Sequence, residues 1–489
     1  MSESTRNALG SPDSGQDAAA RRTGVVGSRR LPVALCLLAV MALELTARLS
    51  GSHAIQSGAN GALFLTVLAA VRDLGFREKY LLTLCAGLTL LTVWLLPDPA
   101  SVLRAGLDQA SFLMAFLLLL NLLHEAASTS PAVAECGRYL TRQPPGRRYY
   151  ALNAGSAFMA VLFNVGVVSF LVPLIQRGIE SATPGDALNP VRERRQVSAM
   201  LRGFAWCVIW SPTAIAPLVV MQLIPGTDRN LWILIGFCIF AGLLVLGALE
   251  DRFTFRAYRP QAGRSVPAFP RSGFLRFLLA CAWLFGMSAA VMGLSGESVV
   301  FGLMVACPVM LVGWLLAQNL HAPQGMLAPT LRRLDVIAFT NLAGAAPVAI
   351  TLACSGFVGH VGAALIPSDT WAQVLGLDAM PDFVFLSLLP VAIAVLSLLA
   401  LSPIMMAVFF GSLIGSLSVL PADPTLTALA ISCGWALSMT FSPFATVVLL
   451  INRGGGIPPR SLTWGWNLRF TLLAALALVP VFAVLTGGR

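Results

Sequence analysis

The sequence contains 489 residues, of which 57% are hydrophobic and 11% charged, and its formal net charge at pH 7 is +10. A soluble domain cannot hide that much apolar surface, so the composition indicates a membrane protein surrounded by a lipid bilayer. Because basic residues in such proteins gather in cytoplasmic loops, the positive charge predicts topology rather than a nucleic-acid partner.

Apolar runs long enough to cross a bilayer recur along the chain. Residues 1–30 precede them, are rich in Ser, Gly, Asp and Arg, and predict a disordered cytoplasmic tail. A spanning helix needs roughly 20 apolar residues, and by this measure we expect about eleven spans. They are 31–49, 55–74, 80–96, 109–127, 196–224, 231–249, 273–294, 299–318, 334–354, 425–451 and 464–485. Two further apolar stretches, 150–175 and 383–417, do not fit simple spans.

The Lys and Arg residues are distributed as expected for a chain that begins in the cytoplasm. With the N-terminus inside, only Arg48, Arg104, Arg229 and Arg489 of the 32 basic residues lie outside. An excess of Lys and Arg marks the cytoplasmic loops of membrane proteins. We therefore expect a multi-pass protein of the bacterial inner membrane, with a cytoplasmic N-terminus and a periplasmic C-terminus.

The same charge pattern predicts that both irregular stretches are re-entrant hairpins. Arginine-rich loops flank 150–175 at both ends, so this hairpin should enter and leave on the cytoplasmic side. No Lys or Arg lies between Arg333 and Arg453, so 383–417 should open to the outside. The alternatives are one long tilted span for the first stretch and two full spans for the second.

Two regions of the chain share a short pattern and the same order of elements. Gly203, Ala205, Ser211-Pro212 and Ala214 coincide at one constant offset with Gly434, Ala436, Ser442-Pro443 and Ala445. Around each pattern we expect three spans, a hairpin, a broken span and a final span, in opposite orientations. Such inverted repeats are typical of secondary transporters. The predicted organisation is a tail at 1–30, an extra N-terminal helix at 31–49, repeat 1 at 50–250, a cytoplasmic linker at 251–272 and repeat 2 at 273–489.

The two Ser-Pro pairs point to the candidate binding residues. Proline lacks an amide hydrogen and clashes with the carbonyl one turn earlier, so Pro212 and Pro443 should break their helices near mid-membrane. A bound solute or ion can satisfy the backbone groups freed there. The candidate solute- or ion-binding residues are Asn164, Gly166, Ser211, Pro212, Thr213, Ser402, Pro403, Ser442, Pro443 and Thr446. The alternatives are ordinary proline kinks and plain polar turns.

The arrangement resembles the ion transporter superfamily, which includes divalent anion/sodium symporters and arsenite-type permeases. The resemblance covers nearly the whole chain after residue 30, mainly as topology, and the segment from Ser156 to Pro173 looks like the first hairpin of that group. It implies eleven spans, two inverted repeats, and a site formed by hairpin tips and broken helices. The Ser-Asn-Thr signature of the dicarboxylate branch is absent, leaving Asn164 alone in the first hairpin and Ser402-Pro403 in the second.

These features predict a secondary active transporter of a small polar or anionic solute, with no cofactor, no metal centre and no catalytic residues. Broken-helix N-termini carry positive dipole ends, which favours an anion. All four histidines, His53, His124, His321 and His360, lie near expected membrane boundaries. A proton relay is therefore not predicted. Na⁺ is the candidate coupling ion, and uncoupled transport is the alternative.

Two other classes of function stay open from the sequence. A membrane-embedded enzyme that modifies glycans or lipids usually carries a large polar outer loop with catalytic residues. The longest outer segment expected here, 355–382, is short and lacks Lys and Arg. A channel or assembly subunit is the other alternative. The sequence identifies neither the solute nor the direction of transport, and it leaves a homodimer open.

Overall fold

The computed structural model describes residues 13–258, 268–320, 322–323, 325–374 and 376–488. Within these residues the chain forms helices and connecting turns and no strand. In this described part, 11 helical segments are long and apolar enough to cross a membrane. The prediction of an all-α polytopic membrane protein is therefore confirmed.

Helices α1 to α10 form the first half of the chain, and the remaining helices form the second. The first half comprises α1 (Asp13–Ser50), α2 (His53–Ala70), η1 (Val71–Asp73), α3 (Phe76–Leu95), α4 (Pro99–Ser128), α5 (Pro131–Thr141), α6 (Pro145–Phe163), α7 (Gly166–Ala182), α8 (Asn189–Cys207), α9 (Ile215–Leu223) and α10 (Arg229–Thr254). The second half comprises α11 (Arg271–Ser295), α12 (Val299–Gln318), α13 (Leu327–Val336), η2 (Ile337–Asn341), α14 (Leu342–Gly344), α15 (Ala346–Ala364), α16 (Ser368–Val374), η3 (Leu377–Ala379), α17 (Asp382–Leu396), η4 (Ser397–Leu399), α18 (Pro403–Gly415), α19 (Pro424–Phe441), α20 (Thr446–Gly455), η5 (Ser461–Asn467) and α21 (Leu468–Leu485).

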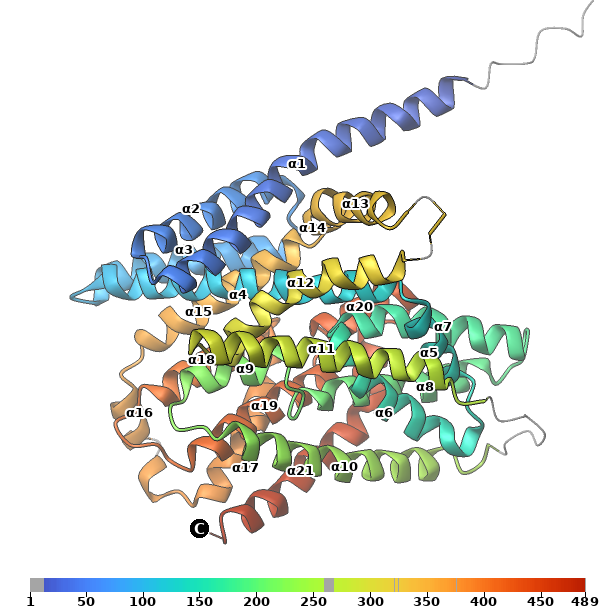
Figure 1. Ribbon diagram of the computed structural model, residues 1–489. Helices are drawn as coiled ribbons and strands as arrows, with labels where there is room; N and C mark the ends of the chain where they lie inside the picture. The colour runs from blue at the N-terminus through green and yellow to red at the C-terminus, as the bar shows by residue number, and fades with distance from the viewer. Residues whose placement is uncertain (1–12, 259–267, 321, 324, 375, 489) are drawn as a thin grey trace, which may run out of the picture.

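The long helices run between two opposite ends of the molecule. They include α4, α10 and α11, with α5 and the start of α8 on the right of the view and α16 and the C-terminus on the left (Figure 1). Helix α1 approaches the body from the upper right. The arginine-rich segments around α5 and α8 thus share one end of the molecule.

Both irregular stretches turn back on themselves. Helices α6 and α7 form a hairpin whose open end points to the right, and α17 and α18 form one that opens to the left (Figure 1). The turn between α6 and α7 rules out one long continuous helix over 150–175. By length and composition alone, Asp382–Leu399 is long enough to cross a membrane.

One expected span is displaced along the chain. The prediction of a span at 334–354 is wrong, because α13 ends at Val336, residues Ile337–Asn341 form a π-helix, and the long helix α15 runs over Ala346–Ala364. Pro347 lies in the first turn of α15, where a missing N–H costs nothing but where a helix arriving from upstream is interrupted. The outer segment expected at 355–382 therefore begins only after Ala364.

The predicted tail and linker are only partly described. Helix α1 begins at Asp13, ahead of Leu31, so the helix includes part of the predicted tail. Residues 1–12 of the tail and 259–267 of the linker lie outside the described residues. Within the predicted linker 251–272, α10 continues to Thr254 and α11 begins at Arg271.

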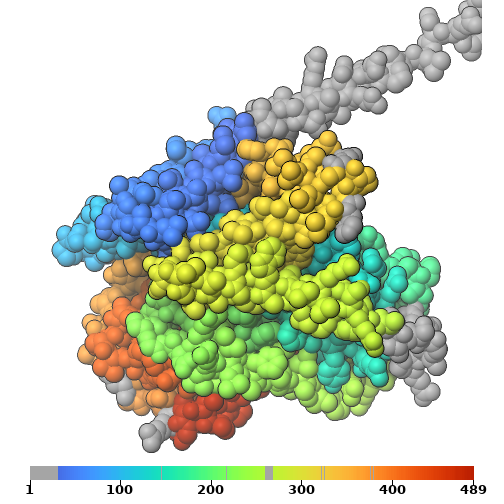
Figure 2. Space-filling view, viewed as in Figure 1, coloured from blue at the N-terminus to red at the C-terminus, as the bar shows by residue number. Residues whose placement is uncertain are grey.

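The core pairs each hairpin with a helix that ends at a Ser-Pro pair. Helix α6 packs on α8, α17 packs on α19, and α4 packs along α15. A Cβ atom on Gly203 would lie 2.0 Å from the Asn153 carbonyl oxygen, and one on Gly434 would lie 2.8 Å from the Ile393 side chain. Both coinciding glycines thus permit a hairpin helix to pack closely, against a backbone oxygen at Gly203 and against a side chain at Gly434. In the space-filling view, α1–α3 form a blue ridge above the body and α11 crosses the visible face (Figure 2).

Candidate functional site

The first Ser-Pro pair interrupts a buried helix. Helix α8 ends at Cys207, the chain passes through turns, and α9 begins at Ile215, so the expected span 196–224 is a broken helix. Pro212 cannot donate a backbone hydrogen bond, which prevents α8 from continuing. Ser211 and Thr213 are 1% and 4% exposed, and their hydroxyl oxygens lie 3.2 Å apart. Two hydroxyl groups are therefore buried between two half-helices.

The tip of the first hairpin is hydrogen-bonded to this break. The Thr213 hydroxyl donates a 2.6 Å hydrogen bond to the carbonyl oxygen of Val161, in the last turn of α6. Carbonyls in the last turn of a helix have no helical N–H partner, so Thr213 satisfies a group that burial would otherwise leave unpaired. The chain then turns at Asn164, and α7 begins at Gly166.

The second break repeats this arrangement with different residues. Helix α19 ends at Phe441, and α20 begins at Thr446. Ser442, next to Pro443, is 1% exposed and donates a 2.9 Å hydrogen bond to the carbonyl oxygen of Ser397 in the second hairpin. At both breaks, therefore, a buried hydroxyl of the broken helix pairs with a backbone carbonyl of the neighbouring hairpin.

Both hairpin tips have strained backbone conformations. Asn164 and Ala400, with φ of 48° and 61°, are the only non-glycine residues of the described chain at positive φ. Such conformations cost on the order of 1–3 kcal/mol, persist only where the surrounding structure enforces them, and cluster at functional sites. Each strained residue closely follows the carbonyl that accepts the hydrogen bond from the break. The broken helices therefore help to hold the strained tips.

Ser402 and Pro403 form the start of a helix rather than an open turn. The Ser402 hydroxyl oxygen accepts a 3.2 Å hydrogen bond from the backbone N–H of Met405 and lies 2.8 Å from the hydroxyl of Ser355 in α15. Pro403 occupies the first turn of α18, where its missing N–H is not needed. Ser402 thus caps α18 and connects the second hairpin to α15.

The second arm of each hairpin packs on the short helix that follows the other break. Helix α7 lies on α20, where the Gln176 side chain donates a 2.7 Å hydrogen bond to the carbonyl oxygen of Gly455. Helix α18 lies on α9, where a Cβ atom on Gly415 would come within 2.1 Å of the Leu223 carbonyl oxygen. Helix α19 contacts both α8 and α9. The two hairpin-and-break units are therefore interlocked.

The charged residue nearest the first break is paired internally. Arg202 in α8 is 3% exposed, and its guanidinium donates hydrogen bonds of 2.8 Å to Glu250 and 2.9 Å to the Asn467 side chain. The same guanidinium lies 4.4 Å from the centre of the Phe470 ring. Its charge is thus balanced inside the protein. The groups around the breaks are hydroxyls, carbonyls and half-helix N-termini, and the described residues contain no cluster of His, Cys, Asp and Glu suited to a metal ion.

His124 is the residue that the sequence analysis did not assign to this site. Its ring lies against the first hairpin tip, because a Cβ atom on Gly166 would be 2.0 Å from His124 Nδ1. The ring centre is 6.3 Å from that of Phe163, and Nδ1 has no hydrogen-bond partner among the described residues. The adjacent Glu125 carboxylate pairs with Arg333 at 3.0 Å. Only the packing of α4 beside the turn reveals this position, so no local sequence signal identifies it.

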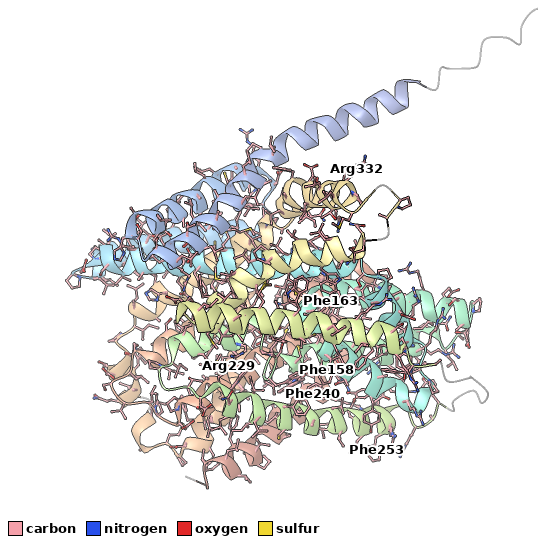
Figure 3. The ribbon with its side chains drawn as sticks, viewed as in Figure 1. Phe158, Phe163, Arg229, Phe240, Phe253 and Arg332 are labelled. Atoms are coloured by element: carbon pink, nitrogen blue, oxygen red, sulfur yellow. The ribbon has the colours of Figure 1, made fainter. Side chains whose placement is uncertain are left out.

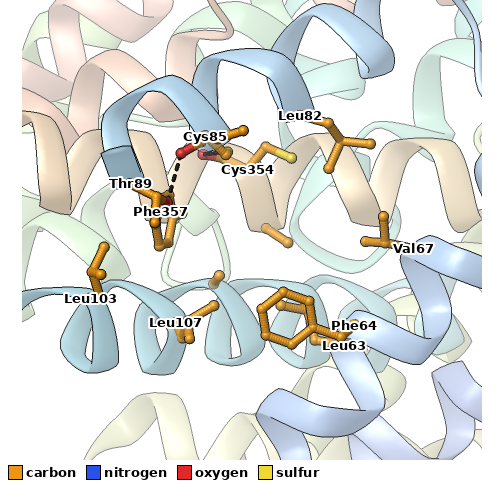
Figure 4. A pocket seen from close by; sticks show the side chains of 13 residues that line it. Leu63, Phe64, Val67, Leu82, Cys85, Thr89, Leu103, Leu107, Cys354 and Phe357 are labelled. Atoms are coloured by element: carbon orange, nitrogen blue, oxygen red, sulfur yellow. Dashed lines mark hydrogen bonds between the residues drawn. The ribbon is translucent and has the colours of Figure 1, made fainter. Parts of the chain in front are cut away.

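A separate cavity of about 300 Å³ contains none of the predicted site residues. It lies between α2, α3, α4 and α15, and its walls include Leu63, Phe64, Leu107 and Phe357 (Figure 4). The Thr89 hydroxyl at its edge is already bonded to the Cys85 carbonyl oxygen at 2.8 Å. Since these walls offer little hydrogen bonding to a polar solute, the breaks and hairpin tips remain the better candidate site.

The chain has the fold of a solved membrane transporter. The crystal structure of the YdaH transporter from Alcanivorax borkumensis, described as having an unusual topology, matches it with a TM-score of 0.50 and 15% sequence identity. The match covers 84% of this chain and 98% of that chain. No protein-family model and no curated protein sequence matches the chain. At 15% identity, the match shows a shared fold and does not define a substrate.

Proposed function

We propose that this protein is a secondary active transporter that moves a small polar or anionic solute across the bacterial inner membrane. The observation that carries the proposal is the pairing of each hairpin with a broken helix through a buried hydroxyl, Thr213 to Val161 and Ser442 to Ser397. Irregular backbone at membrane depth is tolerated where it is buried in protein or lines a water-filled cavity, and in transporters such broken helices form substrate and ion sites. The fold shared with the YdaH transporter supports the same assignment.

The chemistry of the breaks favours an anion or a strongly polar group as the solute. Helices α9 and α20 begin at the breaks, and their N-termini offer backbone N–H groups and positive dipole ends. Carbonyls and hydroxyls next to them are the ligands that Na⁺ takes in transporters with broken helices. We therefore propose Na⁺ as the coupling ion, with Asn164, Gly166, Ser211, Thr213, Ser442 and Thr446 closest to the bound species. Ser402 caps α18 and in this way stabilises the second hairpin tip.

We infer that the halves 50–250 and 273–489 are inverted repeats, that both hairpins are re-entrant, and that the protein belongs to the ion transporter superfamily. The opposite directions in which the two hairpins open support the repeat (Figure 1). The arginine-rich ends of α5 and α8 support a cytoplasmic N-terminus and a periplasmic C-terminus. A homodimer is compatible with this arrangement.

Uptake by the purified protein in liposomes tests the proposal. A panel of organic and inorganic anions, assayed with and without a Na⁺ gradient, should contain at least one solute that accumulates. Pro212→Ala and Pro443→Ala should each reduce its uptake strongly, because a continuous helix withdraws the backbone groups exposed at the break. Ser211→Ala and Ser442→Ala each remove one hydrogen bond, worth on the order of 0.5–1.5 kcal/mol, or up to about 3 kcal/mol with a charged partner.

The control variant is Ser288→Ala, in the uninterrupted helix α11, which should transport as the wild type does. Normal uptake by all four break variants would mean that the breaks are structural kinks and that the site lies elsewhere. If no solute accumulates and the liposomes instead show a chemical change in a lipid or glycan, the protein is an enzyme.

A further inference from the structure

A basic pocket lies at the arginine-rich end of the molecule, away from the breaks. Its volume is about 210 Å³, and its walls come from the start of α6, from α8, from the end of α10 and from the turn that follows α10. The polar groups that line it include Tyr149, Tyr150, Arg195, Arg252, Arg256 and Tyr258. Three arginines and three tyrosines therefore surround a space large enough for a phosphate group and its ester substituents.

The charge of the pocket is only partly balanced. Asp251, which is 5% exposed, forms an ion pair with Arg195 at 2.6 Å, and the Arg195 guanidinium also lies 5.1 Å from the Phe255 ring centre. Arg252 and Arg256 are exposed, and among the described residues neither forms an ion pair. The pocket thus offers two uncompensated positive charges beside a fixed ion pair.

The surroundings of the pocket match the boundary between bilayer and water. Helix α10 is apolar from Leu231 to Leu249, and the pocket lies beside its last turns. Phe253 and Tyr258, 72% and 42% exposed, lie at this end, and Figure 3 shows Phe253 at the outer edge of the molecule, at the opposite end of α10 from Arg229. Tyrosine, like tryptophan, is enriched at membrane–water interfaces, and Tyr258 is such a residue. A pocket at the polar end of an apolar helix, beside an exposed tyrosine, has the position expected for contact with phospholipid headgroups.

From these observations we propose that this pocket binds the phosphate group of an anionic phospholipid. The planar guanidinium of arginine matches phosphate oxygens with two parallel hydrogen bonds, and tyrosine hydroxyls can donate further ones. The Tyr149 hydroxyl is buried and faces the Arg202 guanidinium on the inner side of the pocket. Basic pockets between helices on the cytoplasmic side suit anionic headgroups. A bound phosphate would bridge α6 and the last turn of α10.

Binding to the purified, delipidated full-length protein tests this site directly. Thermal unfolding and native mass spectrometry are followed with phosphatidylglycerol, phosphatidylcholine and inorganic phosphate as separate probes. The wild type should bind phosphatidylglycerol in preference to phosphatidylcholine and unfold at a higher temperature when it is bound. The double variant Arg252→Gln/Arg256→Gln should bind phosphatidylglycerol at least about tenfold more weakly, because it loses two charge-assisted contacts.

The matched control is Arg177→Gln/Arg271→Gln, which removes two exposed arginines outside the pocket. It should keep the affinity for phosphatidylglycerol, since the same change in net charge leaves the pocket intact. Equal loss in both double variants, or equal binding of both lipids by the wild type, would overturn the proposal. Protection by inorganic phosphate alone, lost in the pocket variant, would keep the phosphate site and exclude the lipid as its source. These readouts do not depend on transport.

Discussion

The hydrogen bond from Thr213 to Val161 predicts how firmly the first hairpin tip is held. Thr213→Val keeps the shape of the side chain and removes the hydroxyl that donates to the Val161 carbonyl oxygen at 2.6 Å. Val161 is 8% exposed and lies in the last turn of α6, so its carbonyl would be left buried and unpaired. Leaving such a group unsatisfied costs about 1–3 kcal/mol.

The loss of this hydrogen bond should destabilise the tip of the first hairpin. The backbone at Asn164 is already strained, with φ of 48°, so the substitution favours opening of the turn. A change of about 1–3 kcal/mol in a two-state equilibrium corresponds to a roughly 5–150-fold change in population. Hydrogen exchange of backbone amides in residues 160–168, measured by mass spectrometry, should accelerate within that range. Exchange in α21, far along the chain, should not change.

Thr66→Val provides a matched control for this experiment. Thr66 is as deeply buried, but its hydroxyl donates at 2.8 Å to the Ala62 carbonyl oxygen one turn earlier in the same helix. That carbonyl keeps its helical N–H partner, so the control should leave local exchange almost unaltered. If Thr213→Val exchanges at the tip no faster than the wild type, the break does not hold the hairpin, and the assigned role of this hydroxyl is refuted.

Two further sets of variants test the packing and the strain described above. Gly203→Ala should lower the midpoint of thermal unfolding far more than Gly434→Ala. The added Cβ atom at position 203 would lie 2.0 Å from the fixed backbone oxygen of Asn153, whereas the one at position 434 would lie 2.8 Å from the movable side chain of Ile393. Equal losses in the two variants would contradict this reasoning. Ala400→Gly should leave stability unchanged or slightly higher, since the relief of about 1 kcal/mol at positive φ offsets the added freedom of the unfolded chain. Ala400→Val should destabilise in the same unfolding assay, and a stable valine variant would mean that the turn is not strained.

The helix breaks and the first hairpin turn depend on local chemistry and can be predicted from the sequence. Proline removes a helical hydrogen bond, and both breaks lie where Pro212 and Pro443 predict them. Proline alone does not decide the outcome, because α12 continues through Pro308 and α21 through Pro480. The first turn is found at Asn164 because a short polar side chain, which tolerates positive φ, interrupts a long apolar run. The second turn is less clear in the sequence, since Ala400 carries no such signal and the polar Ser402 caps the following helix instead.

The position of α15 and the contact of His124 with Gly166 depend on tertiary packing and cannot be predicted from the sequence. The apolar run after residue 334 continues without a gap, so hydropathy alone could not separate the π-helix from α15. In the sequence, His124 lies near the end of a long apolar run and is therefore predicted at a membrane boundary, whereas in the structure its ring lies against the first hairpin tip. Its contact with Gly166 arises because α4 packs beside a hairpin tip, and nothing in the spacing of the two residues predicts that contact.

The interlocking of α7 with α20 and of α18 with α9 limits how this sequence can vary. A side chain larger than hydrogen at Gly415 would meet the backbone of Leu223, and one at Gly455 would meet the Val172 side chain at 2.6 Å. Each of these close approaches is between residues of opposite halves of the chain. A larger residue at either glycine can therefore be accommodated only if the other half also changes. At these contacts the two halves therefore cannot vary independently, and a half taken from a related protein should fit only where these glycines and their partners match.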